Sequence, residues 1–168
     1  MENSNYSVLS KILKEKSQVS LEERKALIPA HIELVKSCND QDELCEIAKC
    51  WNLDFEVRKA AAEKITDEVY LNYLAISLTT YGINDDSVEL ILYVVSRVKD
   101  EDIVESVLED ILLCYITIFR EDLFDIILAN VKNIETLEKF IEKEERRFKE
   151  TNWSKKAYER AMQLLANE

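Results

Sequence analysis

The sequence predicts an all-α protein, and three observations lead to this fold class. A single Gly and a single Pro among 168 residues leave little material for tight turns or hairpins. Apolar residues recur at intervals of four, as they do along one face of an α-helix. Asp, Asn or Ser precedes many of these segments, where its side chain suits the N-cap of a helix. We expect one domain over residues 1–168.

The apolar intervals belong to a repeated frame. Counting from Val57 as position 0, Ala61 follows at +4 and Ile65 at +8, and Asp67 at +10 begins the next helix. The same frame recurs with these residues at position 0: Ala30, Leu90, Leu123 and Ala157. The residues at +10 are spaced by 27, 33, 33 and 34: Asp40, Asp67, Asp100, Asn133 and Asn167. The frame predicts five units, with positions 0, +4 and +8 buried in each.

Ten helical segments follow from this frame, two for each unit. Their expected ranges, in order, are Asn5–Lys16, Leu21–Cys38, Gln41–Cys50, Phe55–Ile65, Glu68–Thr80, Asp86–Val98, Glu101–Phe119, Glu121–Val131, Ile134–Lys149 and Trp153–Ala166. Ser20 with Glu23 and Asp40 with Glu43 fit capping boxes. Pro29 suits the first turn of a helix, so the second segment is expected to break there.

One unit has a more specific signature. The stretch "DFEVRKAAAEKITDEVYLNYLA", Asp54–Ala75, resembles a HEAT-type repeat of the short bacterial kind, in which an Asp, a Val-Arg pair and a small residue recur in the second helix of a pair. The resemblance implies a right-handed α-solenoid of about five stacked antiparallel helix pairs. Residues 20–168 would form the repeats, and residues 1–19 an N-terminal capping helix.

Catalytic and metal-binding signatures are missing. Any Ser-His-Asp or Cys-His arrangement would require His31, which we expect at the surface or at a groove edge. The four cysteines form no close pair of the zinc or redox kind: Cys38, Cys45, Cys50 and Cys114. We therefore expect no enzyme activity, no cofactor and no metal. Free cysteines suit a reducing compartment, and the nine-residue apolar run Ile111–Phe119 falls short of the roughly 20 residues that span a bilayer. A cytoplasmic protein is the expectation.

Charge narrows the class of partner. The formal net charge is −12, and residues 84–125 carry twelve acidic and three basic residues, or −9. Such a block repels nucleic acid. The block therefore disfavours a HEAT-like DNA glycosylase, although the chain has aromatic residues that could stack on a base: Trp51, Tyr81, Tyr93 and Trp153. We expect no membrane partner and infer no small-molecule substrate.

These observations favour a protein-binding scaffold or adaptor whose partner carries a basic segment. Positions +2 and +6 point away from the buried stripe, so they are expected to form the binding face together with the acidic block between Asp85 and Asp125. The predicted contact residues are Lys59, Glu63, Asp85, Asp86, Glu89, Leu92, Tyr93, Ser96 and Asp125. An immunity or inhibitor protein that neutralises a basic toxin is the alternative. Two blander interpretations remain: the acids only maintain solubility, and Leu92 lies in an interior helix.

Overall fold

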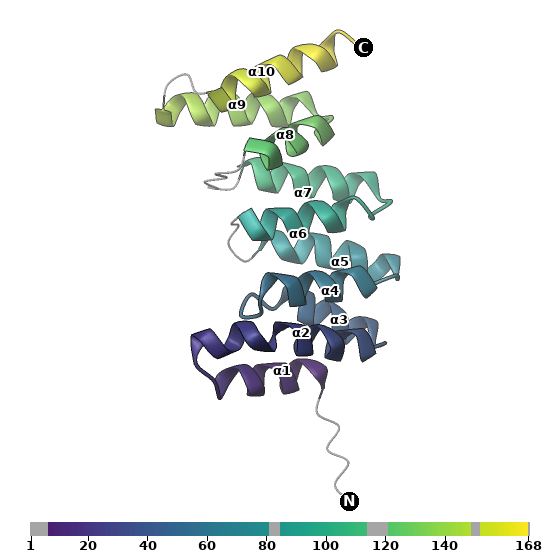
Figure 1. Cartoon of the computed structure of the whole chain (residues 1–168). Coiled ribbons are helices and arrows are strands. Elements are labelled where there is room, and N and C mark those ends of the chain that lie inside the picture. The colour runs from purple at the N-terminus through teal and green to yellow at the C-terminus, as the bar shows by residue number, and fades with distance from the viewer. Residues whose placement is uncertain (1–6, 81–84, 114–120, 149–151, 168) are drawn as a thin grey trace, which may run out of the picture. The chain divides into compact units, whose positions relative to one another are not determined.

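The structure is a computed structural model that describes residues 7–80, 85–113, 121–148 and 152–167. These residues form ten α-helices and no strand, which confirms the all-α prediction (Figure 1). The helices are α1 (Val8–Ser17), α2 (Leu21–Ser37), α3 (Gln41–Lys49), α4 (Phe55–Lys64), α5 (Glu68–Thr79), α6 (Asp85–Val95), α7 (Glu101–Leu113), α8 (Glu121–Asn130), α9 (Ile134–Phe148) and α10 (Asn152–Leu165). Within the described ranges, none of these helices has the length and apolar character required to cross a membrane.

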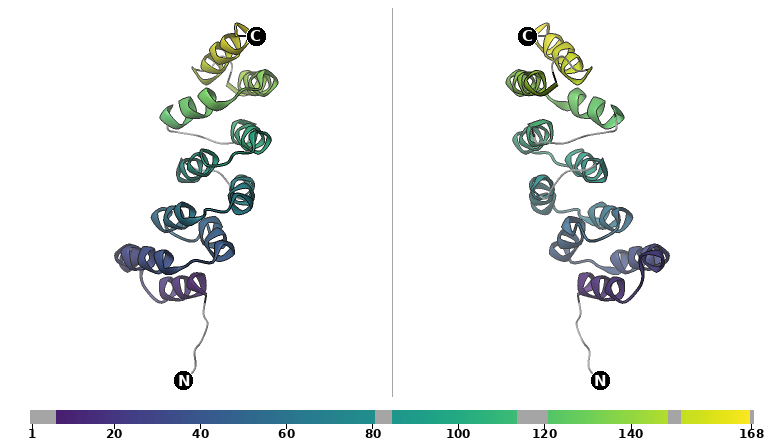
Figure 2. Two further views of the ribbon diagram at one scale, coloured as in Figure 1. Left: turned by 90° about the vertical axis from the view of Figure 1, so that its right-hand side faces the viewer. Right: turned by 90° about the vertical axis from the view of Figure 1, so that its left-hand side faces the viewer.

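The chain divides into two compact units, Met1–Leu78 and Thr79–Glu168. In the first unit, α1 packs against α2 and α3, and α4 packs against α2 and α3. In the second unit, α6 packs against α7 and α8, α9 packs against α7 and α10, and α8 packs against α7 and α10. Within each unit the helices alternate between two layers, with α2 and α4 in one layer of the first unit, and α6 and α8 in one layer of the second (Figure 2).

Most of the positions that the repeat frame assigns to the core are buried. Positions 0 and +4 are buried in α4, α6, α8 and α10, where they are occupied by Val57, Ala61, Leu90, Val94, Leu123, Ile127, Ala157 and Ala161. Position +8 is also buried where it is Cys38, Ile65 or Val131, but Val98 is half-buried and Leu165 at the end of α10 is exposed, so the prediction is wrong at those two. The interval of four places these side chains on one stripe of each helix, and burial of that stripe contributes to the apolar core of each unit.

Helix starts are set by short polar side chains. Ser20 and Glu23 form the predicted capping box at α2. Asp40 accepts hydrogen bonds from the backbone N–H groups of Asp42 and Glu43 at 3.0 and 3.3 Å. The predicted box at Asp40 is wrong in its second half, because the Glu43 carboxylate accepts from the N–H of Leu9 in α1. That carboxylate therefore joins α3 to the start of α1.

The predicted break at Pro29 is also wrong. Helix α2 runs without interruption from Leu21 to Ser37, with Pro29 inside it and exposed. Proline removes the hydrogen bond that the Lys25 carbonyl would receive, but both residues face solvent, where water can replace the donor. The buried stripe of α2 is displaced by one residue from the predicted frame: Ala30 is exposed, and His31 and Val35 are buried.

Other boundaries agree within a few residues, or fall partly outside the described ranges. The first helix was expected from Asn5, and residues 1–6 are not described. The seventh was expected to reach Phe119; α7 is described to Leu113, and Cys114 lies beyond it. Tyr81 and the single Gly also lie outside the described residues.

Two basic side chains make equivalent links between neighbouring helices. Lys64 of α4 donates to two carbonyls at the C-terminal end of α2. Arg160 of α10 donates to two carbonyls at the C-terminal end of α8, at 3.1 and 3.3 Å. The accepting carbonyls occupy positions +6 and +8 in both cases: Lys36 and Cys38, and Ala129 and Val131. A cation at these carbonyls complements the negative end of a helix dipole.

Candidate functional site

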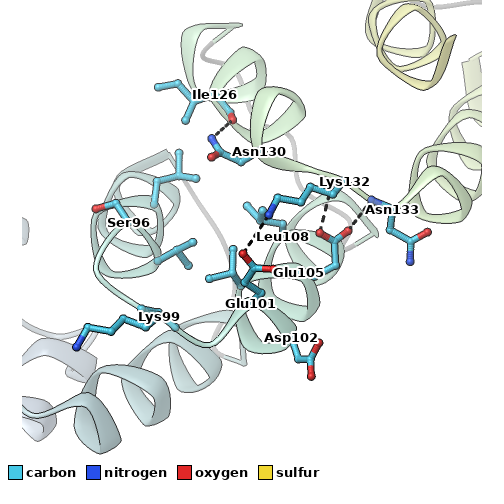
Figure 3. Close-up of a pocket in the computed structure, with 14 residues that line it drawn as sticks. Ser96, Lys99, Glu101, Asp102, Glu105, Leu108, Ile126, Asn130, Lys132 and Asn133 are labelled. Atoms are coloured by element: carbon cyan, nitrogen blue, oxygen red, sulfur yellow. Dashed lines mark hydrogen bonds and ion pairs between the residues drawn. The ribbon is translucent and has the colours of Figure 1, made fainter. Parts of the chain in front are cut away.

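The second unit contains a groove of about 650 Å³ formed by the end of α6, the first turns of α7, the end of α8 and the connection to α9 (Figure 3). Its apolar lining comes from Leu92, Val95, Val98, Val104, Leu108 and Ile126. Its polar lining comes from Ser96, Lys99, Glu101, Asp102, Glu105, Asn130, Lys132 and Asn133. An apolar surface bordered by polar groups is typical of a specific protein interface.

Glu105 holds one wall of this groove in place. Its carboxylate accepts from the backbone N–H groups of Asn133 at 3.0 Å and of Lys132 at 3.4 Å, so it fixes the connection between α8 and α9 (Figure 3). Lys132 also lies 3.4 Å from a carboxylate oxygen of Glu101. Both of those side chains are largely exposed, so solvent screening leaves this ion pair weak. Glu105 therefore has a structural role, whereas Glu101 and Lys132 are accessible to a partner.

The acidic character of the groove itself is modest. Three carboxylates and two lysines line it, and one of those carboxylates, Glu105, is committed to the backbone. Asp102 lies exposed in the first turn of α7, where the helix dipole stabilises its charge. Most of the negative excess of residues 84–125 therefore lies outside the groove lining.

Two of the predicted contact residues, Leu92 and Ser96, come together in the lining of this groove. Leu92 is half-buried, which is intermediate between the two alternatives of a contact site and an interior position. Ser96 is exposed, and its hydroxyl donates to the carbonyl of Tyr93 at 2.7 Å. Tyr93 is half-buried, with the guanidinium of Arg97 5.5 Å from its ring centre.

The predicted acidic contacts differ in their surroundings. Asp125 is exposed but pairs with Lys156 at 2.7 Å, and this lysine pairs equally closely with Glu121. The two carboxylates raise the pKa of Lys156 through hydrogen bonds, Asp125 having the larger effect. Asp86 is exposed and Glu89 half-buried on α6. Asp85 begins α6, and its side chain lies outside what the structure describes.

The remaining predicted contacts, Lys59 and Glu63, belong to the first unit. Both lie on α4, where Glu63 is exposed and Lys59 is half-buried, with its amine 5.7 Å from the ring centre of Phe55. They are separate from the groove described above, which is built from α6 to α9 alone.

His31 is not at the surface, so that expectation is wrong. It is 1% exposed, because it occupies the position that is buried in α4, α6 and α8 as Arg58, Ile91 and Phe124. Its Nε2 atom lies 3.3 Å from Glu15 of α1, although the contact lacks the direction of a hydrogen bond. In this environment the imidazole packs between helices.

The described cysteines are free thiols. Burial raises the pKa of Cys45 to about 11, and it is also the main cause of the raised pKa of Cys38. Both side chains are therefore protonated near neutral pH and weak as nucleophiles. Within the described ranges, no three His, Cys, Asp or Glu side chains gather so as to hold a metal ion.

Several groove residues were not predicted. Glu105, Ile126 and Lys132 lie outside positions +2 and +6, and Glu105 belongs to α7, a helix to which those positions do not apply. Ile126 carried one signal: it is an apolar residue off the buried stripe of α8 and is 45% exposed. The role of Glu105 depends on a neighbour 27 residues along the chain, which no local pattern indicates.

Comparisons of the chain with protein-family models, curated proteins and solved structures found no significant match. The functional argument therefore depends on the groove and on the surfaces of the chain itself.

Proposed function

We propose that this chain is a non-catalytic scaffold or adaptor, a right-handed HEAT-like α-solenoid of five helix pairs that binds a protein with a basic segment. The observation that carries the proposal is the groove at the end of α6, with an apolar lining beside exposed carboxylates. Partner side chains of moderate size would enter it, and their burial would supply affinity. The acids outside the groove would favour a basic partner during encounter.

The solenoid part of this proposal is supported by repetition within the units. Carbonyls at positions +6 and +8 accept from a basic side chain in the first and the second unit, although the two donors lie at different positions, and positions 0 and +4 are buried in both units. Stacked repeats are expected to bury equivalent positions and to contact chiefly their neighbours. Such proteins commonly bind other proteins along their exposed helix faces.

The test is affinity purification with a variant that fills the groove. Ser96→Arg with Ile126→Arg places two long cations on exposed lining positions, so the fold is expected to persist. Tyr158→Arg with Met162→Arg makes the same change in charge on exposed positions of α10 and serves as the control. A basic protein should bind the wild type and the control, and bind the groove variant at least about tenfold more weakly.

Two outcomes decide between classes. If the captured protein is a basic toxin whose activity falls when this chain is added, the chain is an immunity protein, the alternative with the same charge complementarity. If the wild type and the groove variant capture the same proteins equally well, the groove is not the binding site and the proposal fails.

A further inference from the structure

Helix α5 differs from the other helices that follow a +10 boundary residue. The second, sixth and ninth residues after its boundary residue Asp67 are Val69, Tyr73 and Ile76. These side chains are 72%, 51% and 49% exposed. The equivalent residues are Asp42, Glu46 and Lys49 in α3, Asp102, Ser106 and Glu109 in α7, and Glu135, Lys139 and Glu142 in α9. Three helices thus present polar or charged groups where α5 presents large apolar side chains. We call Val69, Tyr73 and Ile76 the α5 stripe.

The stripe has the dimensions of a helix contact. Its first and last residues are seven positions apart, which is about 10 Å along a helix, or two turns. Residues spaced in this way lie on one face and can pack into the side chains of a second helix. Three exposed apolar residues at helical spacing can be covered by a second helix, and because α10 has such a stripe too, the charges around the α5 stripe must specify its partner.

The surroundings of the stripe are acidic at its beginning. Asp67 accepts from the N–H of Val69 at 2.9 Å, and the pKa of the adjacent Tyr70 is raised, first by burial and then by the carboxylates of Asp42, Asp40 and Asp67. Gln41 connects the start of α3 to the start of α5, since its side-chain oxygen accepts from the N–H groups of Thr66 and Asp67 at 2.8 and 3.3 Å.

At the middle of the stripe a lysine is already committed. The amine of Lys49 donates to the hydroxyl of Tyr73 at 2.9 Å, lies 4.6 Å from the centre of its ring, and pairs with Glu46. The ion pair neutralises this cation locally, so the carboxylates at the beginning of α5 dominate the charge beside the stripe. Two copies of this face would bring like charges together, which opposes self-association.

We propose that the α5 stripe binds an amphipathic helix of another protein, one that covers Val69, Tyr73 and Ile76 with aliphatic side chains and carries lysine or arginine beside them. The apolar contact would supply slow dissociation, and the basic residues would pair with Asp42 and its neighbours. This site lies in the first unit and does not depend on the groove of the second.

The experiment uses a phage-displayed library of random peptides of roughly 16 residues, long enough for about four helical turns. The library is selected on the full-length wild type, and enriched peptides are synthesised and titrated. We expect apolar residues at helical spacing with adjacent basic residues. Binding should weaken at least about tenfold in the variant Val69→Ser, Tyr73→Ser, Ile76→Ser.

A matched control removes equally exposed apolar side chains elsewhere. Tyr158→Ser, Met162→Ser and Leu165→Ser change α10, and this variant should bind the peptides within about twofold of the wild type. Asp42→Asn with Glu46→Gln should weaken binding several-fold and reduce its salt dependence. Circular dichroism of each variant verifies that its helices persist.

Three results would overturn the inference: no enrichment over an unrelated protein, peptides that bind the stripe variant unchanged, or a wild-type dimer in sedimentation velocity that the stripe variant abolishes. The last would identify a second copy as the occupant. Peptides sensitive only to the groove substitutions would support the proposed function and exclude the stripe. Loss of binding in the stripe variant, with the groove variant binding the peptides as the wild type does, would support the stripe independently of the proposed function.

Discussion

Helices α5 and α7 occupy equivalent places in the repeat frame but present different surfaces. Each follows an Asp whose carboxylate accepts from the N–H two residues later: Asp67 from Val69 at 2.9 Å and Asp100 from Asp102 at 3.1 Å. Each buries the seventh residue after that Asp, which is Leu74 in α5 and Val107 in α7. On their exposed sides, α5 has the apolar stripe and α7 has acidic and hydroxyl groups. The comparison indicates that a common set of buried positions specifies the helices and leaves the exposed ones available for different contacts.

The largest expected effect comes from a charge at the common buried position. Leu74 and Val107 are 0% and 1% exposed at the seventh place of α5 and α7. Leu74→Asp and Val107→Asp should each lower the free energy of unfolding by roughly 4 kcal/mol or more, because the carboxylate would be buried without a partner. Urea denaturation measures this loss.

The adjacent exposed position supplies the control for both helices. Tyr73→Asp and Ser106→Asp should cost about 1 kcal/mol or less, the size of a change in helix propensity. Equal losses at the sixth and seventh places of either helix would show that the division into buried and exposed positions fails there.

A second expected effect tests a buried position where the repeats differ. Arg58 in α4 is buried, and its Nε donates to the carbonyl of Ala48 in α3 at 3.0 Å, whereas α6 has Ile91 at the equivalent place. Arg58→Ala removes the donor and much of the packed side chain, so a loss of about 2–4 kcal/mol is expected. Arg58→Met should recover part of this loss by restoring volume. If both variants melt like the wild type, Arg58 is not part of the core.

The sequence predicted the fold class, most of the helices and most of the buried stripe, because these depend on local periodicity. It failed at α2, where Ala30 suits a buried or an exposed position equally well and Pro29 suggested a break. The groove was predicted only through Leu92 and Ser96. The remaining lining depends on side chains such as Glu105 that contact residues far along the chain, and single-sequence patterns do not specify these contacts.

A third effect concerns encounter with a partner of the groove. Helix α7 contains no basic residue, and its Glu109 shares Lys139 of α9 with Glu135, whereas Glu142 of α9 has its own partner in Arg146. Asp102→Lys should lower the association rate about twofold or more at low salt, and the difference should shrink as ionic strength rises past about 0.15 M. Stopped-flow mixing with the captured partner measures both quantities.

A charge reversal in α9 is the control for steering. Glu142→Lys alters the net charge by the same amount, but at a position where the acid is already paired with Arg146, and should change the rate less. Equal rate changes in the two variants would show that only total charge matters. Unchanged rates in both would indicate that the acids serve solubility, and the steering role of α7 would be lost.

The smallest expected effect is on stability when the exposed residues of the two helices are exchanged. Val69→Asp, Tyr73→Ser and Ile76→Glu give α5 the residue types of α7. A carboxylate in the first turn gains from the helix dipole, and Tyr73→Ser loses the contact with Lys49, which is worth about 0.5–1 kcal/mol at an exposed site. These contributions oppose each other, so the free energy of unfolding should change by less than about 1 kcal/mol in urea denaturation. A loss as large as that of Leu74→Asp would mean that the α5 stripe belongs to the core of the first unit and is not a surface available for binding.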